Sequence, residues 1–148
     1  MFARIVAVLA LSALFAFGAK VDWATDYKSA VERAKKENKG IFLMLSQPGC
    51  PSCKIMKEGV LKNGESATEE LSQNFVPVEV NILKDGWNKK FRAFATPTFY
   101  ILDKNENKIG RQLIGETSED ELLKALKALK TKSYPYLFCR RFLLLGQG

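Results

Sequence analysis

The chain has 148 residues, which is enough for a single domain with its own hydrophobic core. Its formal net charge is +7, from 23 lysines and arginines against 16 aspartates and glutamates. The lysines are scattered rather than interleaved with stacking aromatic residues, so the composition indicates a solvated surface and argues against a nucleic-acid site.

Residues 1–19 have the three-part layout of a secretory signal peptide. Arg4 makes the start positively charged, residues 5–17 contain no charge, and small residues follow them. The apolar run is shorter than the roughly 20 residues that a membrane-spanning helix needs. We therefore expect cleavage after Gly18 or Ala19 and export of the mature protein, with an uncleaved membrane anchor as the alternative.

The next elements are a helix and a buried strand. The helix is expected to begin at a Thr25 cap and to end before Gly40, with one apolar stripe along it. Residues 41–45 form a continuous apolar run, which is typical of a central strand covered on both faces. Residues 46–49 have the composition of a turn, which leads into a helix that starts at Cys50.

The alternation of helices and strands continues in the second half of the chain. Residues 67–73 predict a short helix, or the end of a long one interrupted near Gly64. Apolar residues alternate with others at 76–80, which predicts a strand with Pro77 near its edge or start. Residues 88–94 predict another short helix.

The last part of the domain predicts a hairpin and a helix. Residues 98–102 and 108–114 are expected to form the two strands of the hairpin, joined by a turn at 103–107. Residues 117–121 contain overlapping capping-box signals, and three leucines then line one face of the helix, at 122, 126 and 129. This order predicts an α/β fold, in which a mixed central sheet is flanked by helices on both faces and ends in a β-hairpin and a C-terminal helix.

Cys50 and Cys53 are the candidate catalytic residues. Their spacing at a helix start places both sulfurs on one side of the first turn, where free backbone N–H groups and the helix dipole stabilise a thiolate. Thiolates in such motifs can have pKa values of about 3.5 to 7.5. We therefore expect Cys50 to exchange disulfides with a substrate and the more buried Cys53 to resolve the mixed disulfide.

The pair is also compatible with a zinc half-site, a structural disulfide or coincidence in an unrelated fold. A zinc site needs two further ligands, and the chain has no histidine and one other cysteine, Cys139. A structural disulfide across so short a loop gains little entropy from the unfolded state. Nearby, Lys54 and Lys57 either favour the thiolate or belong to a solvated helix face. These considerations favour a redox pair without a metal.

Several stretches resemble exported thioredoxin-like domains related to the C-terminal domain of the disulfide reductase DsbD. They are residues 23–41, the Cys-x-x-Cys-Lys motif, residues 74–80 and residues 95–103. The resemblance covers roughly residues 21–130. The cysteine motif becomes specific when the Thr-Pro-Thr-Phe strand follows it at this distance.

The resemblance implies a thioredoxin fold over residues 20–131. In that family the proline that matches Pro97 follows a cis peptide bond opposite the redox pair, and the residue before it, here Thr96, offers its backbone to an extended substrate. The dipeptide Pro51-Ser52 between the cysteines helps to set the redox potential, and Lys54 is a further candidate for tuning the thiolate.

The sequence departs from thioredoxins proper at three places. Gly49 stands where they carry a tryptophan before the first cysteine, and Pro51-Ser52 replaces Gly-Pro. Met44 stands where they place a buried acid that takes the proton of the resolving thiol, and no obvious general base replaces it. The motif alone is therefore compatible with either redox direction, and a general thioredoxin activity is not expected.

The expected function is that of a periplasmic thiol–disulfide oxidoreductase, which reduces protein disulfides with electrons from a membrane thiol carrier. Its expected partners are protein thiols and disulfides rather than nucleic acid or metal, and it needs no cofactor beyond a Cys50–Cys53 disulfide. The alternatives are a disulfide oxidase or isomerase, and a non-catalytic thioredoxin-fold binding or chaperone module. Residues 132–148 form a tail of unknown role, which contains Cys139 and could pack on the domain, lie on a membrane surface, bind a partner or be disordered.

Overall fold

The computed structural model describes residues 21–84 and 90–132 of the chain. The signal peptide predicted at 1–19, and the tail from residue 133 with its Cys139, lie outside the described residues. Within the two described segments, no helix is both long enough and apolar enough to cross a membrane.

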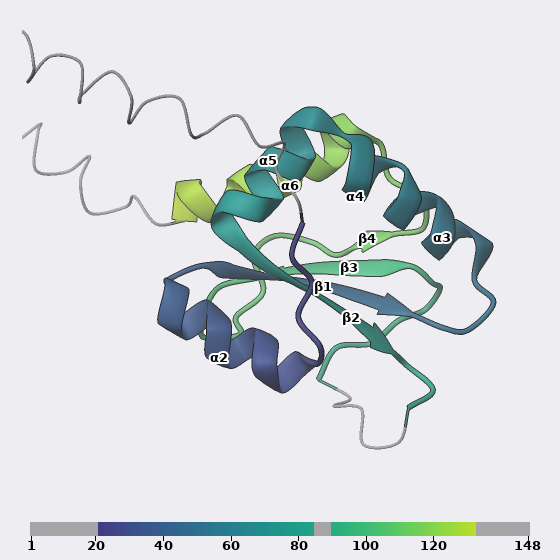
Figure 1. Ribbon diagram of the computed structural model, residues 1–148, viewed down its shortest axis with the longest axis horizontal. Helices are drawn as coiled ribbons and strands as arrows, with labels where there is room; N and C mark the ends of the chain where they lie inside the picture. Colours follow the sequence, from purple (N-terminus) through teal and green to yellow (C-terminus); the bar gives the residue numbers. More distant parts are fainter. Residues whose placement is uncertain (1–20, 85–89, 133–148) are drawn as a thin grey trace, which may run out of the picture.

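A four-stranded mixed sheet forms the centre of the fold (Figure 1). In spatial order β2-β1-β3-β4, its strands are β2 (Phe75–Asn81), β1 (Gly40–Ser46), β3 (Thr98–Leu102) and β4 (Leu113–Ile114). Strand β1 runs parallel to β2 and antiparallel to β3, and β4 pairs antiparallel with β3. The sheet is therefore partly parallel and ends in an antiparallel pair, as the sequence predicts.

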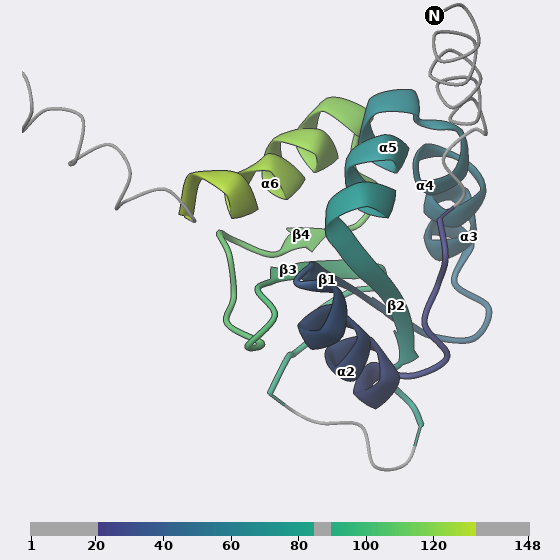
Figure 2. The ribbon, with the colours of Figure 1, turned by 60° about the vertical axis from the view of Figure 1, so that its left-hand side comes forward.

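Helices cover both faces of this sheet (Figures 1 and 2). One face carries α2 (Tyr27–Glu37), and the other carries α3 (Pro51–Glu58), α4 (Val60–Asn63), α5 (Glu65–Asn74) and α6 (Glu119–Lys132). The helical connection from β1 to β2 is interrupted near Gly64, as predicted, and also at Gly59. The predicted α/β architecture is thus confirmed.

Strand β1 separates two hydrophobic cores. All of its residues are buried. Phe42 and Met44 belong to the core on the side of α3–α6, whereas Ile41, Leu43 and Leu45 belong to the core on the side of α2. Because both faces are covered, neither can be polar, which explains the continuous apolar run in the sequence.

The caps of α2 differ from the sequence prediction. Asp26, rather than Thr25, is the N-cap, because its side chain accepts the backbone N–H of Ser29 at 2.8 Å. The helix ends at Asn38, whose backbone adopts the left-handed conformation with φ 55°. Gly40 belongs instead to β1, where a Cβ atom would lie 2.7 Å from an aromatic ring of β2.

Because of the Asp26 cap, the stability of the protein should vary with pH in the acid range. Hydrogen bonds, above all the one from the backbone N–H of Ser29, lower the pKa of Asp26 from its ordinary value of 3.8. A carboxyl with a lowered pKa stabilises the fold above its ordinary value, and this contribution is lost as the pH falls through the folded-state value. Asp26→Ala should therefore lower the melting temperature at neutral pH, and the deficit should shrink as the pH falls below 3.8.

Thermal unfolding followed by circular dichroism measures this dependence. Asp26→Asn is the matched control, because asparagine is also a good N-cap and should lose less stability at neutral pH. A deficit of Asp26→Ala that is equally large at neutral and at strongly acid pH would contradict the prediction.

Two segments are less regular than predicted. Within 88–94, the described residues form no helix, and Phe91 is instead buried between two tyrosine rings whose centroids lie 6.1 and 5.2 Å from its own. The strand predicted at 108–114 is reduced to β4 and one isolated bridge at Lys108. Between these two, Gly110 turns the chain with φ 69°, which interrupts the pairing with β3.

The hairpin turn and the last helix agree with the prediction. The carboxylate of Asp103 accepts two backbone N–H groups of the turn. Ser118 caps α6 by accepting the backbone N–H of Glu121 at 3.3 Å. Leu122 and Leu126 are fully buried, so α6 packs onto the core that also contains Phe42.

Candidate active site

The predicted redox pair lies where β1 leads into α3. The turn after β1 contains Gly49 with a positive φ of 73°, and Cys50 is the N-cap of α3. Pro51 occupies the first helical position, where the missing N–H would have had no partner within the helix. Cys50 and Cys53 form a disulfide, with their Cα atoms 5.3 Å apart.

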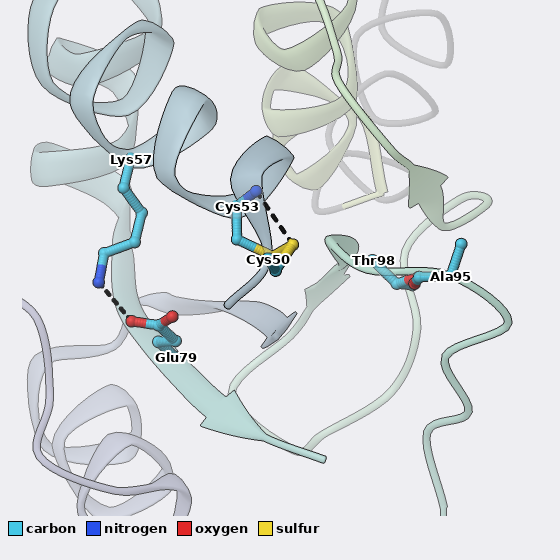
Figure 3. Close-up of a disulfide and its surroundings, with 6 residues drawn as sticks. All are labelled: Cys50, Cys53, Lys57, Glu79, Ala95 and Thr98. Carbon is cyan, nitrogen blue, oxygen red and sulfur yellow. Dashed lines mark hydrogen bonds and ion pairs between the residues drawn. A yellow bond between two sulfur atoms is a disulfide. The ribbon is translucent and has the colours of Figure 1, made fainter. Parts of the chain in front are cut away.

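The two cysteines differ in exposure. Cys50 is half-buried at the surface, whereas Cys53 is 5% exposed and packs with the core beneath α3. The backbone N–H of Cys53 donates to Cys50 Sγ at 3.1 Å (Figure 3). In the reduced protein, this N–H and the positive end of the helix dipole stabilise a thiolate on Cys50. The geometry therefore supports the predicted division of roles, in which Cys50 meets the substrate.

An open pocket of about 570 Å³ lies beside the disulfide. Four of the predicted site residues line it: Cys50, Pro51, Cys53 and Lys54. The remaining motif residue, Ser52, lies on α3 outside this lining. The pocket also contains charged side chains from two elements, namely α3 and β2.

Glu79 of β2 is a residue of this pocket that the sequence pattern does not reveal. Its carboxylate forms an ion pair with Nζ of Lys57 on α3 (Figure 3). In the register of β1 and β2, Glu79 is the partner of Met44, which is fully buried. The spacing of Lys57, four residues after Cys53, places it on the same face of α3, but nothing in the sequence of α3 identifies its partner on β2.

Thr96 and Pro97 precede β3, and the peptide bond between them is cis. Thr96 is half-buried and Pro97 is buried. The carbonyl of Pro97 accepts the backbone N–H of Gly115 at 2.8 Å, and the Thr98 hydroxyl donates to the carbonyl of Ala95 at 2.6 Å. These bonds fix the loop on one side of the disulfide, opposite the charged pair of the pocket (Figure 3).

These features define the class of the protein. A cysteine disulfide at the start of the helix after the first strand, in a mixed sheet covered on both faces, is the arrangement of a thiol–disulfide oxidoreductase. Residues 27–130 match the family model of the thioredoxin-like domain. The chain belongs to this family, and its fold is a thioredoxin fold.

Solved structures agree with this assignment. A thioredoxin from Thermus thermophilus is 23% identical, with a TM-score of 0.65 over 78% of this chain and 92% of that chain. The oxidised C-terminal domain of DsbD from Neisseria meningitidis is 18% identical, with a TM-score of 0.53 over 66% of this chain and 86% of that chain. At these identities the likeness concerns the fold alone. At that level, it confirms the predicted resemblance to the thioredoxin-like family that includes the DsbD domain.

The chain is also similar to part of a larger protein. Spermatogenesis-associated protein 20 of Rattus norvegicus is 41% identical over 61 residues, which are 41% of this chain and 8% of that protein. Its counterpart in Homo sapiens is 39% identical over 61 residues, again 8% of the protein. The chain thus matches less than a tenth of the length of these relatives.

Proposed function

We propose that this protein is an exported, periplasmic thiol–disulfide oxidoreductase that reduces disulfide bonds in other proteins. The asymmetry of the two cysteines carries the proposal. Cys50 is accessible and its sulfur receives a backbone hydrogen bond, while Cys53 is buried behind it. One sulfur can therefore meet a substrate and the other acts within the protein, which is what dithiol exchange requires.

The reaction begins with the reduced protein. The Cys50 thiolate attacks one sulfur of a substrate disulfide, and the other substrate sulfur leaves as a thiolate and takes up a proton. The Cys53 thiol then loses its proton and attacks Cys50 Sγ, which releases the second substrate thiol and closes the Cys50–Cys53 disulfide. The substrate gains two electrons and two protons. The two cysteines supply both electrons, Cys53 supplies one proton, and water supplies the other, because Cys50 reacts as a thiolate.

The substrate is proposed to bind as an extended segment along Thr96 and Pro97. Thr96 is half-buried beside the cis bond, so part of its surface stays accessible. Two exposed apolar side chains support this location: Phe94, which is 80% exposed and precedes the loop, and Ile114, which is 48% exposed and pairs with Thr98. Side chains of this kind would cover apolar residues of a bound protein segment.

Regeneration of the dithiol requires a second thiol partner. Because the leader at 1–19 predicts export, the proposed donor is a membrane thiol carrier, and the only cofactor in the proposal is the Cys50–Cys53 disulfide itself. The reductive direction is supported by the resemblance to domains related to the reductase DsbD.

A measurement of the reduction potential tests this direction. Protein isolated from the exported fraction should begin at Ala19 or Lys20, and it should equilibrate with dithiol buffers near the value of about −270 mV that thioredoxin has. Mass spectrometry identifies the N-terminal residue. Thiol alkylation at each buffer ratio measures the fraction of reduced protein and hence the reduction potential. A potential near about −120 mV would contradict the reductase and favour an oxidase, and an intact leader would contradict processing by a signal peptidase.

A further inference from the structure

The proton of Cys53 needs an acceptor, because the step that closes the disulfide uses the Cys53 thiolate. Cys53 is 5% exposed, and the thioether of Met44 does not take up a proton. We propose that the carboxylate of Glu79 accepts this proton through water in the pocket that both residues line, and that Lys57 holds the carboxylate in place. The inference rests on the proposed dithiol exchange, and it names the group that makes the second step fast.

The sheet register brings Glu79 to the side of the cysteines. Val78 packs in the core on the side of α2, so its neighbour Glu79 points to the opposite face, toward α3. On that face Glu79 lies beside Met44 of β1. A carboxylate from the neighbouring strand thus reaches the region where Met44 provides none.

The pocket provides the route between the two groups. Cys53 and Glu79 both line it, and its volume of about 570 Å³ has room for several water molecules, each of which takes about 30 Å³. A general base can act through one such water. The side chains of Lys57 and Glu79 are 40% and 32% exposed, so a proton that reaches Glu79 can pass on to solvent.

Lys57 is suited to position the carboxylate. It forms the ion pair with Glu79, and its Nζ lies 5.6 Å from the ring centroid of Trp23, so it is held from two directions. The other charged residues that line pockets with Glu79 are two cations and two anions: Lys54 and Glu58 of α3, Asp26 before α2, and Lys84 after β2. The charges of these four residues offset one another. Lys57, which forms the ion pair with Glu79, is therefore the partner that sets the position of the carboxylate.

The proposed step balances within the protein and its substrate. The S–H bond of Cys53 breaks, and its proton passes through water to Glu79. The Cys53 sulfur forms a bond to Cys50 Sγ while the bond from Cys50 to the substrate sulfur breaks. The substrate sulfur leaves with the electron pair as a thiolate, and Glu79 returns the proton to it or to water.

Rapid mixing of the reduced protein with dithiobis(nitrobenzoate) separates the two steps, because each step releases one coloured aryl thiolate. All proteins in the experiment carry Cys139→Ser, so that only the pair reacts. Glu79→Gln should change the first phase little and slow the second about 100-fold, at the lower end of what general acid–base catalysis contributes. It should also make the second phase rise with hydroxide concentration across the neutral range.

Three further variants distinguish a proton acceptor from a structural ion pair. Glu79→Asp keeps a carboxylate and should keep the pH profile of the parent protein. Lys57→Gln should slow the second phase less than Glu79→Gln does and should also keep this profile. Glu32→Gln, which removes a carboxylate from the exposed face of α2, should behave as the parent protein.

Two results would overturn the proposal. One is a second phase of unchanged rate and pH profile in Glu79→Gln. The other is an equal slowing in Glu79→Gln and Lys57→Gln without any change of profile, which is the result of a merely structural pair. A parent protein that shows no first phase would instead overturn the proposed dithiol exchange, so the two failures are distinguishable.

Discussion

Replacement of Cys50 by serine should abolish the reduction of disulfide substrates, whereas replacement of Cys53 by serine should stop the reaction half-way and leave the substrate attached. Cys50 provides the accessible thiolate at the N-terminus of α3, and a serine hydroxyl does not take over this nucleophilic role. Cys53 is buried behind it, so its loss spares the first attack and removes the group that releases the substrate.

A disulfide-linked peptide pair that carries a fluorophore and a quencher measures the loss of turnover in both variants. Non-reducing mass spectrometry then detects the adduct, which should sit on Cys50 in Cys53→Ser. Cys139→Ser serves as the parent protein, because it removes the third thiol that could form an unrelated adduct. If Cys50→Ser turned over the substrate at the rate of the parent protein, this result would contradict the proposed redox function and favour a binding module.

The second large effect is expected in the core beneath the site. Phe42 of β1 is fully buried and stacks on Phe99 with ring centroids 5.4 Å apart. It also packs in a T-shaped arrangement with Trp23, with ring centroids 6.4 Å apart. Phe42→Ala removes these contacts and leaves a cavity in the core on the side of α3–α6. It should lower the free energy of unfolding by about 3–5 kcal/mol.

Urea unfolding followed by circular dichroism measures this loss. The matched control is Phe94→Ala, because Phe94 is 80% exposed and its truncation should change the free energy of unfolding by less than about 0.5 kcal/mol. Equal effects of the two substitutions would show that the stacked rings contribute no more than a surface residue does.

The sequence predicts best where the pattern of a single element decides the structure. The apolar run of β1 and the leucines of α6 have one way to be buried, and both elements lie where they are expected. Caps and short pairings are less predictable, since a neighbour can compete: Asp26 takes the cap in place of Thr25, and Gly110 shortens the returning strand.

In the site, too, the features of a single element could be predicted from the sequence, whereas a contact between two elements could not. Cys50 and Cys53 could be found from their spacing alone, because both lie within one helical turn. The contact of Lys57 with Glu79 joins α3 to β2 across 22 positions of sequence, and it depends on which strand pairs with β1 and in which register. No periodicity within either segment records that pairing. The acid near Met44 could therefore be located only in the folded chain.

The sheet that keeps the two cores apart also separates two properties of the molecule. Cys53 belongs to one core only, together with Phe42 and Met44, while the core under α2 contains neither cysteine. Substitutions among the side chains under α2, such as Leu43 or Val78, can therefore adjust how firmly the domain resists unfolding while the surroundings of the sulfur atoms stay the same. Resistance to heat and redox potential can thus vary independently among relatives that share this layout.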